Sequence, residues 1–223
     1  MRAVLFDFDG VLVDSEPLHY RALRECLVPC GITIDEEKYL RCYLAYDDRE
    51  SIRIALERHG EPYDPDRVDE VARRKAGLYE TLMAEVPFFP GARDLIASLA
   101  DEVPLGIASG ARRAEIEGIL TAAGLRGAFA AVVGADDVTR TKPHPEPYLA
   151  AMAGLAPLVP GLAPPECLVV EDSMPGIASA LAAGMKVLAV SHTYPAEKLR
   201  AAHRVVGGLQ GLEPSTLRGL FPA

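Results

Sequence analysis

The sequence contains no tryptophan, few cysteines, no excess of basic residues and no long apolar run. Lys and Arg number 23 against 32 Asp and Glu, so the formal net charge is −9. An acidic chain without a basic block is poorly suited to bind nucleic acid or an anionic membrane surface, and we expect neither as a partner. A membrane-spanning helix needs about 18 consecutive apolar residues, and no such run occurs.

The four cysteines are spread irregularly along the chain: Cys26, Cys30, Cys42 and Cys167. Cys26 and Cys30 could share a helix face, but no second Cys or His pair accompanies them, so buried apolar thiols are favoured over a zinc site. Sparse cysteines suggest a reducing compartment. The opening residues also lack a basic leader and a small-residue cleavage site, so we expect a cytoplasmic protein.

The rest of the composition is that of an ordinary globular protein. The chain has 223 residues, of which 49% are hydrophobic and 25% charged. This length suits one large domain or a core domain with a small insert.

Short apolar segments alternate with helical ones at the start of the chain and after Pro87. We expect strands at 3–8, 104–108, 128–133, 167–170, 185–190 and 203–206. We expect helices between them at 92–100, 111–123, 145–153 and 174–183. This alternation predicts an α/β fold with a parallel sheet and helices on both faces.

Residues 15–85 have a different pattern, because nearly all their apolar positions repeat with helical spacing. Pro17 is well placed in the first turn of a helix. We therefore predict a core domain of residues 1–14 and 86–223, and an all-helical cap domain of residues 15–85. The insert leaves the core at the end of the first strand, where it could act as a lid.

Polar residues stand at the ends of four predicted strands. They are Asp7 and Asp9, Ser109 and Gly110, Lys142, and Glu171 and Asp172. In open parallel sheets ligands bind beyond the carboxyl ends of the strands, so these residues are expected to meet at one place.

The chemistry of this set suits phosphoryl transfer. Several carboxylates in one place require a cation, and hard oxygen ligands favour Mg²⁺. One carboxylate can attack phosphorus and a second, two residues on, can move protons. Lys142 and Ser109 would stabilise the charge of the phosphoryl oxygens, and Gly110 would let the backbone approach them.

The motifs Asp7-Phe8-Asp9-Gly10-Val11, Ser109-Gly110, Lys142-Pro143 and Glu171-Asp172-Ser173 resemble the four ordered motifs of the haloacid dehalogenase (HAD) superfamily. The resemblance implies a Rossmann-like core, Asp7 as nucleophile and Asp9 as general acid and base. It also implies that Mg²⁺ is held by Asp7, the Asp9 carbonyl and Asp172, with Glu171 bound directly or through water. Asp at position 9 is typical of the phosphatase and phosphomutase branch.

The predicted cap resembles that of the phosphoglycolate phosphatase and beta-phosphoglucomutase group, beginning at Asp14-Ser15-Glu16-Pro17-Leu18-His19. The resemblance implies substrate-binding roles for His19, Arg49 and Lys75, with Arg49 gripping a distal phosphate. A structural histidine, a salt bridge from Arg49 to Glu50 or Asp47, and a solvated helix face at Lys75 are the alternatives. Residues 43–48 lack the glycine usual before that arginine and differ from the mutases.

These features support three hypotheses for the function. The first is a Mg²⁺-dependent phosphatase acting on a small phosphorylated metabolite, such as a sugar phosphate or phosphoglycolate, as a monomer or weak dimer. The second is a phosphomutase of the beta-phosphoglucomutase type. The third is a phospho-aspartyl switch like a receiver domain, which does not explain the inserted helices.

Overall fold

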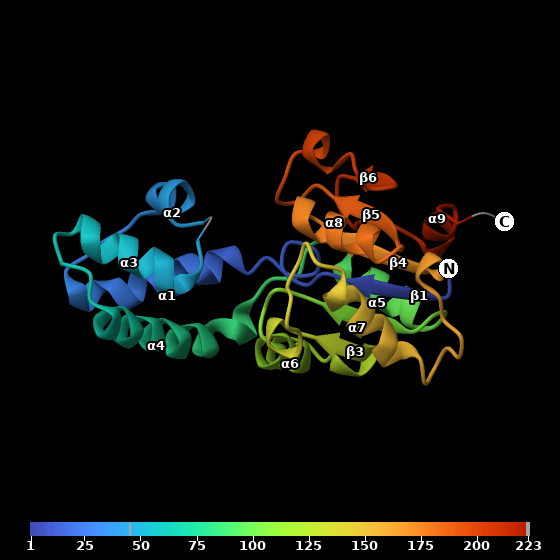
Figure 1. Cartoon of the computed structure of the whole chain (residues 1–223), viewed down its shortest axis with the longest axis horizontal. Coiled ribbons are helices and arrows are strands. Elements are labelled where there is room, and N and C mark those ends of the chain that lie inside the picture. The colour runs from blue at the N-terminus through green and yellow to red at the C-terminus, as the bar shows by residue number, and fades with distance from the viewer. Residues whose placement is uncertain (45, 222–223) are drawn as a thin grey trace. The chain divides into compact units, whose positions relative to one another are not determined.

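The computed structural model describes residues 1–44 and 46–221, and Figure 1 traces them. The chain divides into two compact units. The core unit comprises Met1–Asp14 and Pro87–Ala223, and the helical unit comprises Ser15–Val86. The predicted core range 86–223 and the atypical stretch 43–48 each include residues outside the described part, namely Pro222, Ala223 and Ala45.

The core unit is built on a six-stranded sheet with the order β3-β2-β1-β4-β5-β6, and every pairing is parallel. The strands are β1 Ala3–Phe6, β2 Leu105–Ala108, β3 Phe129–Val133, β4 Cys167–Glu171, β5 Lys186–Val190 and β6 Arg204–Val206. The predicted parallel α/β fold is therefore confirmed.

The first strand ends at Phe6 and is shorter than predicted, because the chain turns from Phe8 onward. Gly10 has a φ of 76°, and the backbone N–H of Leu12 donates to the carbonyl of Phe8 at 2.8 Å. The fourth strand is longer than predicted by one residue and includes Glu171. Both differences concern the residues at the sheet's carboxyl edge.

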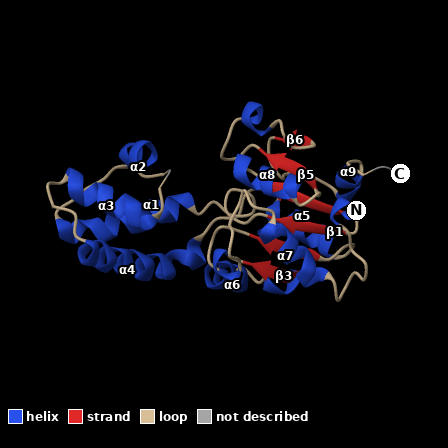
Figure 2. Cartoon of the chain, viewed as in Figure 1, coloured by secondary structure: helices blue, strands red, loops and turns tan. Residues whose placement is uncertain are grey.

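Helices lie on both faces of the sheet, as Figure 2 shows. Those of the core unit are α5 Ala92–Ala100, α6 Arg113–Ala122, α7 Glu146–Leu155, α8 Met174–Ala182 and α9 Pro214–Arg218. Short 3₁₀ turns occupy Arg126–Ala128, Ala135–Asp137, Pro164–Glu166 and Ala196–Leu199.

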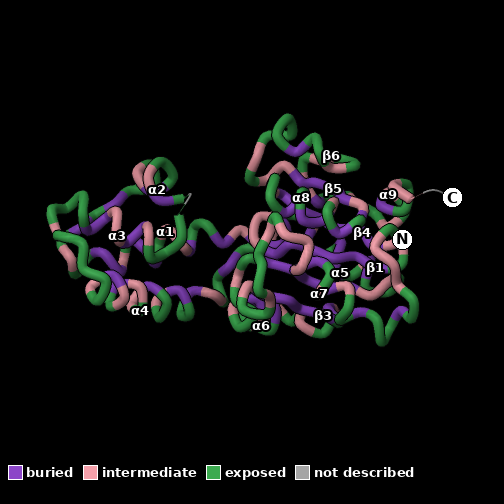
Figure 3. Tube along the Cα trace, viewed as in Figure 1, coloured by how far each residue is buried: buried purple, intermediate pink, exposed green. Residues whose placement is uncertain are grey.

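β1 lies in the interior of the sheet and is buried on both of its faces. Leu5 joins one buried cluster with residues of α7 and α8, and the alternate side chains Val4 and Phe6 are equally buried. β1, β2 and β4 are buried along their whole length, whereas β6 at the edge of the sheet is exposed or half-buried (Figure 3). A strand buried on both faces reads as a continuous apolar run, which is how residues 3–6 appear in the sequence.

The helical unit has a hydrophobic core of its own. Its helices are α1 Glu16–Leu27, α2 Glu36–Cys42, α3 Asp48–Arg58 and α4 Pro65–Leu82, with 3₁₀ turns at Val28–Cys30 and Met83–Glu85. The carboxylate of Asp47 caps α3 by accepting the backbone N–H of Glu50 at 2.9 Å. Asp47, one of the two acids among residues 43–48, therefore has a structural role.

All four cysteines are free thiols. Cys26 and Cys167 are buried, as predicted, whereas Cys30 and Cys42 are half-buried and do not fit that prediction. Within residues 1–44 and 46–221, no helix combines the length and apolar character needed to cross a bilayer.

We predict that Gly91→Ala destabilises the core unit by about 2 kcal/mol or more. Gly91 has a φ of 84°, and a Cβ there would lie 2.5 Å from the Cα of Gln210. Gly127→Ala is the matched control, because its Cβ would meet nothing within 4 Å. Urea unfolding should show a large loss for the first variant and about 0.5 kcal/mol or less for the second. Equal losses would contradict this account of Gly91.

Candidate active site

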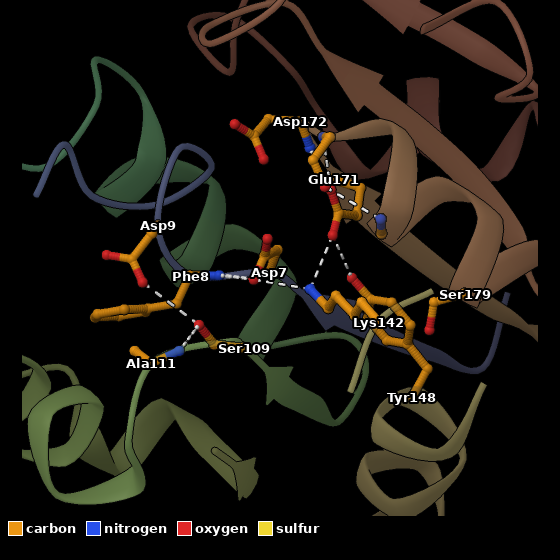
Figure 4. A network of polar contacts seen from close by, with 12 residues as sticks. Asp7, Phe8, Asp9, Ser109, Ala111, Lys142, Tyr148, Glu171, Asp172 and Ser179 are labelled. Carbon is orange, nitrogen blue, oxygen red and sulfur yellow. Dashed lines mark hydrogen bonds and ion pairs between the residues drawn. The ribbon is translucent and has the colours of Figure 1, made fainter. Parts of the chain in front are cut away.

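Asp7 is placed at the sheet's carboxyl edge by the register of β1. Phe6 lies opposite Ile107 of β2 and Val170 of β4, and the Asp7 N–H donates to the Val170 carbonyl at 2.9 Å. The Asp7 carboxylate is buried and accepts the backbone N–H of Phe8 at 2.8 Å. The turn at Gly10 brings Asp9 to the same edge, where Figure 4 shows both side chains.

Lys142 joins two of the predicted site residues. Its Nζ lies 2.9 Å from Asp7 Oδ1 and 2.8 Å from Glu171 Oε1 (Figure 4). Although burial acts to lower it, the pKa of Lys142 is raised by these two carboxylates. Lys142 is therefore a fixed positive charge against the carboxylate of Asp7.

Glu171 is fully buried and both its oxygens are hydrogen bonded. Oε1 accepts from Lys142 Nζ and from the Tyr148 hydroxyl at 3.0 Å. Oε2 accepts from the backbone N–H groups of Asp172 and Ser173, each at 2.8 Å, and from Ser173 Oγ at 2.9 Å. A carboxylate offers about four lone-pair sites, so five donors leave little capacity for a direct metal bond. The geometry supports Glu171 as the anchor of Lys142.

Asp172 is buried close to these groups. Oxygens of Asp7, Glu171 and Asp172 all lie within 4.8 Å of one another. Burial and the Glu171 carboxylate raise the pKa of Asp172 to about 7. Burial likewise raises the pKa of Asp7 well above its ordinary value, against the opposing effect of Lys142. One lysine does not balance three buried acids, so the group has the charge and the oxygen atoms to hold a hard cation.

Ser109 lies on the other side of Asp7, next to Asp9. Its Oγ donates to Asp9 Oδ2 at 3.4 Å and accepts the backbone N–H of Ala111 at 3.1 Å. Ser109 does not cap the helix that follows it, because α6 begins at Arg113 and its N-cap is Arg112. Gly110 adjoins this turn, and a Cβ there would meet nothing within 4 Å.

Three predicted substrate-binding residues belong to the helical unit, and two of them contact each other. Lys75 is only 2% exposed, and its Nζ lies 3.1 Å from His19 Nδ1 and pairs with the carboxylate of Asp48. The His19 ring stacks on Tyr79 with centroids 4.3 Å apart. The alternative of Lys75 as a solvated helix face is therefore wrong.

Arg49 has a different partner and is 61% exposed at its side chain. Its guanidinium pairs with Asp69 of α4, whereas the sequence suggested Glu50 or Asp47 as salt-bridge partners. Asp47 caps α3, and Glu50 pairs with Arg53, so both acids are engaged elsewhere.

Sequence reasoning missed two side chains that support the acids. Tyr148 sits at an apolar position of α7, and only the burial of its hydroxyl against Glu171 reveals a polar role. Thr193 follows β5 and donates to Asp172 Oδ2. Neither residue carried a signal in the sequence, because each contact depends on a residue far away in the chain.

Tyr148→Phe should lower the free energy of unfolding by about 1–3 kcal/mol, because it removes a hydrogen bond to a fully buried carboxylate. Tyr63→Phe is the control, since Tyr63 is 61% exposed, and it should change stability by about 0.5 kcal/mol or less. Chemical denaturation measures both. An unchanged free energy of unfolding in Tyr148→Phe would show that the hydroxyl does not contribute to stability.

Burial and the nearby Lys75 ammonium lower the pKa of His19 to about 4. Proton NMR of the imidazole groups should therefore give His19 a midpoint near pH 4, with His19→Gln identifying its signal. Lys75→Met should raise this midpoint, because it removes a positive charge beside the ring. A wild-type midpoint at 6.5 would contradict the buried His19–Lys75 contact.

Comparisons with known proteins agree with this geometry. The family model described as haloacid dehalogenase-like hydrolase matches residues 4–190. Protein CbbY of Rhodobacter capsulatus is 30% identical over 202 residues, covering 87% of each chain. Hexitol phosphatase B of Escherichia coli K12 is 32% identical over 190 residues, covering 84% of this chain and 82% of that protein.

A solved structure of beta-phosphoglucomutase from Clostridium difficile is also similar. It has a TM-score of 0.76 and 26% sequence identity, and the match covers 99% of this chain and 96% of that one. The family match spans the core motifs and the helical insert together. The chain therefore belongs to the haloacid dehalogenase-like hydrolase family.

Proposed function

We propose that the protein is a Mg²⁺-dependent phosphatase that hydrolyses a small phosphomonoester through a phosphorylated Asp7. The observation that carries this proposal is the Asp7 carboxylate held 2.9 Å from the Lys142 ammonium, with Asp172 and Asp9 at the same sheet edge. A nucleophilic carboxylate beside a fixed cation is suited to attack an anionic phosphorus centre.

The donor set fits Mg²⁺. Asp7 and Asp172 are buried carboxylates whose pKa values are raised by burial, so a bound cation would relieve the cost of ionising them. These two side chains and the Asp9 backbone carbonyl would hold the ion, while Glu171 holds Lys142. When bound, Mg²⁺ neutralises charge on the phosphoryl oxygens.

The protein's own groups account for each step of the reaction. A carboxylate oxygen of Asp7 forms a bond to phosphorus while the bond from phosphorus to the leaving oxygen breaks. Asp9 gives that oxygen its proton. Asp9 then takes a proton from water, and the water oxygen attacks phosphorus, which releases phosphate and restores Asp7. Lys142 and the Ser109 hydroxyl stabilise the phosphoryl oxygens throughout.

The substrate class we favour is a sugar or polyol monophosphate. The similarity to a hexitol phosphatase supports a polyhydroxy leaving group. The two cationic cap residues predicted to bind the substrate form ion pairs within the helical unit, Lys75 with Asp48 and Arg49 with Asp69. A second phosphate or a carboxylate on the substrate would need an unpaired cation to bind it. Because Lys75 and Arg49 are already paired with acids, we favour a substrate that is uncharged apart from the phosphate that is removed.

A phosphomutase is the second candidate, because the fold is similar to that of a beta-phosphoglucomutase. It would use the same Asp7 chemistry and return the phosphoryl group to a sugar. The atypical stretch 43–48 and the neutralised Arg49 favour hydrolysis. The switch hypothesis is set aside, since the family match extends through the helical insert.

We predict that Asp7→Asn lowers phosphate release by at least about 1000-fold, because an amide cannot form the phosphoryl bond. Circular dichroism should show an unchanged fold. Acid-quenched wild type, but not the variant, should carry acid-stable label from ³²P-labelled substrate. An active Asp7→Asn enzyme would contradict the mechanism.

The substrate is tested by phosphate release from a panel of phosphometabolites with Mg²⁺ and with EDTA. We expect hexose or hexitol monophosphates to give the highest kcat/KM, and EDTA to abolish release. Arg49→Ala should change kcat/KM for the best substrate by less than about threefold. Conversion of a sugar 1-phosphate to its 6-phosphate with little free phosphate would instead establish the mutase.

A further inference from the structure

Residues 191–194, which follow β5, contact both acidic loops of the proposed site although they belong to none of the four motifs. Thr193 reaches the loop after β4, and His192 reaches the loop after β1. All of these residues belong to the core unit.

The Thr193 contact falls on a carboxylate that is proposed to bind the metal. The hydroxyl of Thr193 donates to Oδ2 of Asp172, whose side chain is buried. A hydroxyl bound to one oxygen lowers that atom's negative charge and fixes the rotation of the carboxylate. The other oxygen, Oδ1, is then the stronger and better-oriented ligand.

The loop after β1 packs directly on this pair. A Cβ at Gly10 would lie 2.0 Å from Asp172 Oδ2 and 2.9 Å from Thr193 Oγ1, so only a glycine backbone fits there. The Gly10 carbonyl lies 2.9 Å from His192 Nδ1. A carbonyl only accepts, so His192 carries its proton on Nδ1.

His192 is itself held in place. Its ring stacks on Phe89 with centroids 3.9 Å apart and an interplanar angle of 18°. Thr193 is itself exposed, but it follows directly after a residue that is held against the same loop that supplies Asp9. These contacts of His192 hold the segment where the Thr193 hydroxyl can donate to Asp172.

We propose that Thr193 is a positioning residue for the magnesium ion, acting through Asp172. This inference rests on the proposed function, because it assigns a support to the ion's protein ligand. Groups that hydrogen bond to metal ligands typically contribute 10- to 100-fold to metal affinity. Thr193→Val removes the hydroxyl at nearly constant shape, and Thr193→Ser keeps it.

The test is metal binding to the full chain without substrate. Mn²⁺, which favours the same oxygen ligands, is titrated and the free ion is measured by electron paramagnetic resonance. Thr193→Val should weaken binding by about 10-fold or more, and Thr193→Ser should stay within about threefold of wild type. In turnover assays Thr193→Val should need more Mg²⁺, with most of kcat recovered at saturating metal.

Equal Mn²⁺ affinity for wild type and Thr193→Val would overturn the inference and leave the proposed function standing. An equal loss in Thr193→Ser would also overturn it, because the hydroxyl would then be irrelevant. Asp172→Ala should abolish binding. If wild type binds no Mn²⁺, or Asp172→Ala binds as wild type does, the proposed metal site itself fails and this inference fails with it.

Discussion

The ammonium group of Lys142 lies between the carboxylates of Asp7 and Glu171, and the arrangement of the site depends on these two ion pairs. A buried lysine is costly unless it is paired and hydrogen bonded. Here it has two acid partners, so it stays charged in spite of burial. The Lys142 ammonium, which pairs with two acids at this edge of the sheet, is also the group expected to attract an anionic substrate.

Glu171 makes this contact possible because every part of its carboxylate is held. Its donors come from α7, from the segment before α7, and from the backbone at the end of β4. A fixed anion of this kind determines where the lysine amine lies. The acids at this edge therefore differ in role. Glu171 fixes the Lys142 side chain, whereas Asp7 and Asp172 carry negative charge that a bound cation could balance.

The sequence was sufficient to predict the parallel sheet, because strands buried on both faces appear as short apolar runs between helices. It also predicted that Asp7, Lys142 and Asp172 would meet, since residues after parallel strands share an edge. It could not separate Glu171 from the other acids, because its role follows from hydrogen bonds to Tyr148 and Ser173. Lys75 was equally ambiguous: it stands in a run of basic residues, and only packing against His19 and Asp48 reveals that it is buried.

The position of β1 in the sheet has a consequence for folding. This strand is the first in the chain but lies between β2 and β4, so Leu5 pairs with Gly106 and with Val169. Such pairings close long stretches of chain, and this closure costs conformational entropy and slows folding. Asp7, the proposed nucleophile, therefore reaches its position only in a chain that has brought residues from both halves together. A nascent or partly unfolded molecule carries the same Asp7 but none of the chemistry that its neighbours confer.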